Sequence, residues 1–194
     1  MKRLLVTALA SLMPGLAAAA PAILPTRDVS IQYSLAVPGQ QVQTVQLFYN
    51  AALEAARVVS DNGYYVLANL PAGKAQLVVP ALHAIVQTPD FSLLTGELFL
   101  AGNARFTLLG AGHYAGLNCR TYRVVVKDST AQACITADGV VLHFSGHDEH
   151  GGASLTALRV TYGPQPASQF QPPLGFSDIN LPPGAVQALL TPQN

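Results

Sequence analysis

The feature that most constrains this chain is a strict alternation of apolar and polar residues near its beginning. Successive side chains of a β-strand point to opposite faces, so an alternation with period two predicts a strand with one buried face. The same pattern returns at Val45, Leu47 and Tyr49. Such a chain is expected to form a sheet with one apolar side. In the first segment the apolar positions are Val29, Ile31, Tyr33, Leu35 and Val37, and the positions between them are Ser30, Gln32, Ser34 and Ala36.

Short extended segments separated by turn residues continue along most of the chain. Pro and Gly mark these turns, because Pro fixes one φ angle and Gly accepts positive φ. Residues 51–56 fit either a helical turn or a wide hairpin loop, and Gly110-Ala111-Gly112 predicts a further loop. Strands are expected at residues 57–60, 64–68, 74–79, 84–88, 105–109, 117–126, 133–136, 140–144 and 155–161.

One helix and a proline-rich tail complete the pattern. Asp90 can cap a helix that runs to Leu100 and ends at Gly102. Proline cannot donate to a sheet ladder, so residues 166–194 are expected to form a tail that packs on the domain or leaves it. Without repeats or linkers, residues 21–165 predict one domain. Its expected fold class is mainly β, a single curved antiparallel sheet with one short helix.

The first twenty residues predict export. Lys2 and Arg3 precede an apolar run, and Ala18-Ala19-Ala20 ends it in the small-residue pattern of a signal-peptidase site. We expect cleavage after Ala20, and the periplasm or the exterior as the place where the protein works. No later window of roughly 20 residues is apolar enough to predict a membrane-spanning helix in the mature chain.

The charge balance excludes some partners. Loss of Lys2 and Arg3 leaves eight basic and ten acidic residues, a net charge of −2. A near-neutral chain lacks the basic patch typical of nucleic-acid binding. Half of all residues are apolar and only 10% are charged, which suits a large sheet with an extensive apolar side.

The order of residues resembles an uncharacterised family of Gram-negative periplasmic proteins, similar to the LolA/LolB/LppX-like lipoprotein carriers. The resemblance implies an open half-barrel whose concave apolar face holds acyl chains beneath a helical lid. The carriers usually begin with a helix, for which this chain leaves little room before Val29. The segments that carry the resemblance are Gly63-Tyr64-Tyr65-Val66-Leu67, the hairpin at residues 71–74, Arg105-Phe106-Thr107 with Gly110, Ala115-Gly116-Leu117 with Cys119 and Tyr122, residues 133–142, and residues 160–165.

Cys119 and Cys134 are the only cysteines in the chain. An even count in an oxidising compartment predicts a disulfide. A hairpin that turns near Asp128-Ser129 would place Cys134 opposite position 123, roughly 13 Å from Cys119 along the strand. A disulfide needs Cα atoms within about 7 Å. A bulge or a local fold-back would therefore be needed, and two buried free thiols are the alternative.

Residues 143–150 gather the side chains that zinc or copper prefers. The glycines around them predict a solvated hairpin tip, and we expect no metal, no cofactor and no catalytic residue there. Ser145 lies too close in sequence to its His and Asp neighbours to form a catalytic triad with them. The side chains concerned are His143, His147, Asp148, Glu149 and His150.

The expected function is therefore non-enzymatic. A monomer would bind or escort a lipid, an acyl chain or a lipid-modified partner in a concave apolar groove, with residues 90–100 as the lid. The alternative is a ligand-free structural or interaction module of the cell envelope with a closed core. The expected groove residues are Ile31, Tyr33, Leu35, Leu47, Tyr49, Phe91, Leu94, Phe99, Val124, Val126 and Leu142.

Overall fold

A computed structural model describes residues 20–87, 104–126, 129–148 and 151–180. These residues form one mainly β structure with two short 3-10 helices, η1 (Pro80–Leu82) and η3 (Ala167–Phe170). The strands are β1 (Val29–Ala36), β2 (Gln43–Asn50), β3 (Ala55–Ser60), β4 (Tyr65–Asn69), β5 (Lys74–Val79), β6 (Ala84–Gln87), β7 (Arg105–Tyr114), β8 (Leu117–Val126), β9 (Ser129–Ile135), β10 (Val141–Asp148), β11 (Gly151–Tyr162) and β12 (Ser177–Asn180).

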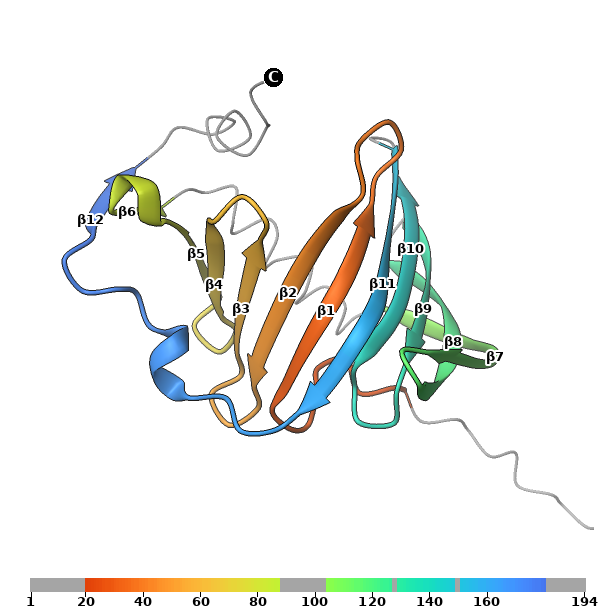
Figure 1. Ribbon diagram of the computed structural model, residues 1–194. Coiled ribbons are helices and arrows are strands. Elements are labelled where there is room, and N and C mark those ends of the chain that lie inside the picture. Colours follow the sequence, from red (N-terminus) through yellow and green to blue (C-terminus); the bar gives the residue numbers. More distant parts are fainter. Residues whose placement is uncertain (1–19, 88–103, 127–128, 149–150, 181–194) are drawn as a thin grey trace, which may run out of the picture.

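All twelve strands belong to one curved sheet, in the order β12-β6-β5-β4-β3-β2-β1-β11-β10-β9-β8-β7. Two antiparallel meanders, β1–β6 and β7–β11, meet where β1 pairs with β11 (Figure 1). The curved, mainly β sheet expected from the sequence is confirmed. One pairing differs from expectation, because β12 runs parallel to β6.

A row of apolar side chains crosses seven neighbouring strands. Directly paired residues share a face of the sheet, so this row defines one face, which we call the core face. Six inter-strand steps of about 4.8 Å make the row roughly 29 Å long. Its members, in order, are Val86, Leu77, Val66, Val58, Leu47, Ile31 and Val160. We call this set the apolar row.

Three apolar clusters stabilise the sheet. The first is centred on β1 and includes Val29, Ile31 and Tyr33, each at most 4% exposed. The second joins Leu77 and Val86 on β5 and β6. The third joins Tyr122, Ala133 and Ile135 on β8 and β9, with Phe106, Val124 and Val141 packed against it.

The segment after residue 165 continues into the sheet. Arg57 on β3 donates to the Gln169 carbonyl of η3, and its guanidinium lies over the Tyr65 ring. The Phe176 ring contacts His83, and the Ser177 amide donates to the His83 carbonyl, which starts the pairing of β12 with β6. Residues 166–180 thus run beside β3 to the β6 edge of the sheet (Figure 1).

The expected disulfide is confirmed, with the Cα atoms of Cys119 and Cys134 5.4 Å apart. The predicted register between β8 and β9 was wrong by two residues, because the chain reverses one residue earlier than expected. Val126 pairs with Ser129, so Cys134 lies opposite Thr121 rather than residue 123. Cys119 is then only two residues away along β8, on the same face as Thr121, and its Cα atom lies within bridging range of Cys134.

The predicted loop at Gly110-Ala111-Gly112 was also wrong, because all three residues lie inside β7. A methyl carbon on Gly112 would lie 2.5 Å from the Cys134 sulfur. Gly112 therefore allows the disulfide to approach the backbone of the neighbouring strand, and it does not interrupt that strand.

Other expectations have mixed outcomes. Residues 51–54 form a turn between two paired strands. Of the two alternatives, the hairpin loop is therefore found and the helical turn is not. The expected hairpin tip near residue 147 is short, because β10 extends to Asp148 and β11 begins at Gly151. Residues 1–19 of the expected signal peptide (1–20), the lid helix (90–100) and the end of the tail (181–194) lie outside the described residues. None of the helices in the described part has the length and apolar character that crossing a bilayer requires.

Candidate functional site

The core face carries the first part of the candidate site. Of the expected groove residues, the structure brings Ile31, Tyr33, Tyr49 and Leu142 into the first apolar cluster, where each is at most 4% exposed. Leu47 is half-buried beside them. Tyr33 also donates a hydrogen bond of 2.8 Å from its hydroxyl to the Val141 carbonyl, and burial raises the pKa of this hydroxyl.

The remaining expected groove residues are more scattered. Leu35 is half-buried near the far end of β1. Val124 packs against the third cluster, and Val126 is half-buried at the end of β8. Phe91, Leu94 and Phe99 lie outside the described residues. The expected groove thus divides into a buried part on β1, β2 and β10 and a more accessible part on β8.

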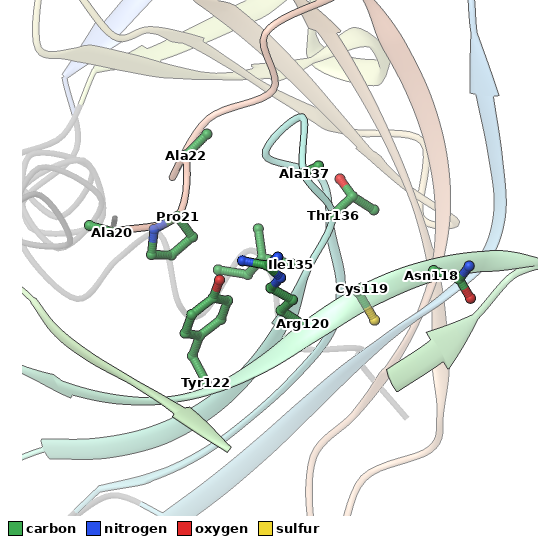
Figure 2. A pocket seen from close by; sticks show the side chains of 10 residues that line it. All are labelled: Ala20, Pro21, Ala22, Asn118, Cys119, Arg120, Tyr122, Ile135, Thr136 and Ala137. Atoms are coloured by element: carbon green, nitrogen blue, oxygen red, sulfur yellow. The ribbon is translucent and has the colours of Figure 1, made fainter. Parts of the chain in front are cut away.

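A pocket of about 390 Å³ lies beside the third cluster. Strands β8 and β9 form one wall, and the chain segment before β1 forms the other (Figure 2). Figure 2 shows the Arg120 and Tyr122 side chains pointing toward Pro21. The lining residues are Ala20, Pro21, Ala22, Asn118, Cys119, Arg120, Tyr122, Ile135, Thr136 and Ala137.

Contacts with the β9–β10 hairpin fix the segment that forms this second wall. The Thr26 amide donates to the Asp138 carbonyl, and Arg27 forms a salt bridge of 2.8 Å with the Asp138 carboxylate. The Arg27 guanidinium also lies 3.6 Å from the centre of the Tyr162 ring. We call Arg27, Asp138, Tyr162 and Thr136 the clasp, because together they hold the chain before β1 against the end of the sheet.

The clasp sets the electrostatics of Asp138. Partial burial tends to raise the pKa of this carboxyl group, but hydrogen bonds from Thr136, Arg27 and Tyr162 favour the ionised form. The balance leaves the pKa of Asp138 below its ordinary value. The carboxylate that follows the lining residues Thr136 and Ala137 is therefore engaged by the clasp.

Of the histidines singled out in the sequence, His143 and His147 lie on β10, whereas His150, together with Glu149, lies outside the described residues. No group of three potential metal ligands occurs among them. His143 lies on β10, where it hydrogen-bonds Thr156 and stacks on Tyr114 with ring centroids 4.9 Å apart. These contacts give His143 a structural role.

Comparison with known proteins gives structural matches only. No protein-family model and no curated protein matches the sequence. A chain of the Pseudomonas aeruginosa MucA/MucB complex matches with a TM-score of 0.52 at 18% identity, over 74% of this chain and 55% of that one. MucB alone matches with a TM-score of 0.53 at 15% identity, over 78% and 59%. An uncharacterised conserved protein from Thermus thermophilus gives 0.59 at 11% identity, over 80% and 91%.

These matches support the open half-barrel sheet, and at such low identity they extend to the fold alone. The present chain spans little more than half the length of MucB. A LolA superfamily protein from Nitrosomonas europaea also matches, at 10% identity over 77% of this chain and 92% of that one, with a TM-score of 0.39. That score is too low to support an argument.

The pocket was not among the features predicted from the sequence. Arg120 and Tyr122 were not among the expected groove residues, because the alternation on β8 was counted through Val124 and Val126. Arg120, Tyr122 and Val124 are two residues apart along β8, so they lie on one face. An arginine that shares one face with Tyr122, Val124 and Val126 was the available signal.

Proposed function

We propose that this protein is a non-enzymatic binding protein of the cell envelope that holds or escorts a lipid, an acyl chain or a lipid-modified partner against the core face of its sheet. The observation that carries the proposal is the apolar row, which continues across seven strands of an open sheet. One lipid tail spans about 15 Å, half of a roughly 30 Å hydrocarbon layer. The row is long enough to contact one extended tail.

Several side chains of the apolar row are buried, so a ligand could reach them only if the core face became accessible. Ile31, Leu77 and Val86 are at most 2% exposed, whereas Val58 and Val66 between them are half-buried. We infer that the core face opens to admit an acyl chain. Each CH₂ group transferred from water would contribute about 0.8 kcal/mol.

The compartment is part of the proposal. A disulfide between Cys119 and Cys134 fits an oxidising environment, and the first twenty residues predict export. We infer that the mature protein works in the periplasm or outside the cell.

Photolabelling tests the binding proposal without requiring a ligand to be known in advance. The full chain would be irradiated with a diazirine analogue of palmitic acid, and the labelled peptides mapped by mass spectrometry. We expect saturable labelling of strands that carry the apolar row, removed by excess palmitate. Label that excess palmitate fails to remove, or label spread over both faces, would contradict the proposal.

A matched pair of variants sharpens this test. Val58 belongs to the apolar row, and its neighbour Val59 lies on the opposite face, paired with Gln46. Both side chains are half-buried. Val58→Asn is expected to reduce labelling several-fold, whereas Val59→Asn should leave it unchanged. Thermal unfolding of both variants checks that each still folds.

Two observations favour a second candidate, a ligand-free interaction module. The best-packed groove residues are almost fully buried, as in a closed core. MucB, which shares the fold, has been crystallised in complex with MucA. In that case the photolabel would show no saturable site, and palmitate would leave the unfolding midpoint unchanged.

A further inference from the structure

Two polar side chains point into the pocket and lack partners among the described residues. Tyr122 is 6% exposed, and its hydroxyl makes no hydrogen bond in the described part of the chain. Its ring is held edge-on against Phe106, with centroids 5.9 Å apart. The hydroxyl oxygen is not among the fully buried polar atoms without a partner in the described part of the chain, so it faces the pocket and can donate a hydrogen bond to whatever fills it.

Arg120 adds an unpaired positive charge at the same place. It lies two residues before Tyr122 on β8 and pairs with Ile135 on β9, another lining residue. Within residues 20–87, 104–126, 129–148 and 151–180 its guanidinium forms no ion pair and no hydrogen bond. Arginine offers five N–H donors in a planar fork that fits carboxylate and phosphate groups.

The other polar groups of the pocket do not offset this charge. None of the described lining residues is Asp or Glu. Asp138, which follows the lining residues Thr136 and Ala137, is bound by the clasp. The opposite wall presents the small apolar side chains of Pro21 and Ala22, and the expected cleavage after Ala20 would add the positively charged amino group of Pro21 to it. The pocket therefore combines two adjacent hydrogen-bond donors, Tyr122 and the exposed Arg120, with a lining of mixed polarity that carries no carboxylate among the described residues.

We propose that this pocket binds the anionic head group, carboxylate or phosphate, of an amphiphile, with Arg120 and Tyr122 as its two donors. Tyr122 and Ile135 belong to the third apolar cluster, so a chain attached to the head group would lie toward Phe106 and Val124. That an acyl chain is bound rests on the proposed function. The preference for a negatively charged head group rests on the pocket alone.

Three ligands with the same chain length separate these two parts. Isothermal titration of the full chain would compare dodecanoate, dodecyl phosphate and dodecanol at slightly alkaline pH, where both acids are ionised. A hydrogen bond to a charged group contributes about 1.5–3 kcal/mol, so at least one of the anions is expected to bind ~10-fold or more tightly than the alcohol. The tighter of the two anions identifies the head group.

Three variants assign the effect to residues. Arg120→Gln should remove most of the preference for the anion, and Tyr122→Phe should weaken anion binding about fivefold while leaving dodecanol unchanged. Tyr122→Phe keeps the ring and its contact with Phe106. Arg123→Gln is the matched control, because Arg123 is exposed and lies on the opposite face of β8. Thermal unfolding checks that each variant folds.

The outcomes distinguish the two proposals. Equal affinity for all three ligands, unchanged in Arg120→Gln, would overturn the head-group site and leave the proposed function standing. Absence of binding for every ligand would overturn both. An equal loss of anion binding in Arg120→Gln and Arg123→Gln would show a general effect of net charge and would also overturn the site.

Discussion

At the scale of single residues, Gly112 shows how one missing side chain accommodates a covalent bond on a neighbouring strand. A methyl group there would collide with the Cys134 sulfur and would lie 3.3 Å from the Cys119 sulfur. Gly110, two residues earlier on the same strand, has open space where its methyl group would lie. The two glycines therefore have different roles, although nothing in the segment Gly110-Ala111-Gly112 distinguishes them.

This difference predicts the behaviour of two alanine variants. Gly112→Ala should lower the free energy of unfolding by about 1–3 kcal/mol, because neither the bridge nor the strand can move without strain. Gly110→Ala should change it by less than about 1 kcal/mol. Urea unfolding under non-reducing conditions measures both values. Equal losses would show that the disulfide does not determine the residue at 112.

A second residue-scale prediction concerns acid. The pKa of Asp138 is lowered in the folded protein, so its ionised form stabilises the fold at pH values above its unfolded-state pKa, about 3.9. This stabilisation is lost as pH falls through the lower, folded-state pKa. Asp138→Asn should reduce stability at neutral pH by roughly 1 kcal/mol. The exposed Arg27 contributes little to that loss.

Unfolding free energies of wild type and Asp138→Asn, measured from neutral to strongly acidic pH, test this expectation. The two curves should converge only below the lowered, folded-state pKa of Asp138. A constant difference across the range would contradict the clasp as the origin of the lowered pKa.

At the scale of elements, the strands were predictable where alternation is strict and turns are marked. Val29 to Leu35 and Val45 to Tyr49 fall in β1 and β2 as expected. The predictions of local structure were wrong where a residue distant in sequence but close in space determines the conformation. Glycines 110 and 112 indicate a loop until the disulfide beside them is known. Similarly, the register of β8 and β9 depends on a turn one residue earlier than the sequence suggested.

The β8–β9 hairpin carries its own covalent constraint. Its disulfide closes a loop with a sequence separation of 15. Loops of this length are expected to stabilise a fold by about 3 kcal/mol, mainly by limiting the unfolded chain. The double variant Cys119→Ala with Cys134→Ala should lose about that much in urea unfolding. The same loss should follow reduction of the wild type, and no loss in either case would contradict the prediction.

The parallel strand β12 depends on the ring contact that precedes it. Phe176→Ala should loosen the β12–β6 pairing by about 1 kcal/mol, and the amides of residues 84–87 should then exchange about fivefold faster with deuterium. Leu174→Ala is the control, since Leu174 is 99% exposed. Equal exchange rates in both variants would show that β12 is held by its ladder alone.

At the scale of the whole molecule, β1 and β11 form the seam between two meanders. Hydrogen bonds on both sides of each strand and the first apolar cluster surround this seam. Amides of β1 and β11 should therefore exchange with deuterium only on global unfolding, whereas β12 and β7, at the two ends of the described sheet, should exchange earlier. Exchange at the seam as fast as at these ends would contradict a single cooperative sheet.

The same seam has a consequence for the order in which the protein is made. Every other antiparallel pairing in the described sheet joins strands that follow one another in sequence, but Ile31 of β1 pairs with Val160 of β11. At about 5–20 residues per second, the partner of β1 leaves the ribosome on the order of ten seconds after β1 itself. During that interval β1 has one unpaired edge and an apolar face, the combination most prone to mispairing. The nascent chain is thus most vulnerable at its beginning, and this vulnerability ends only when β11 has been made.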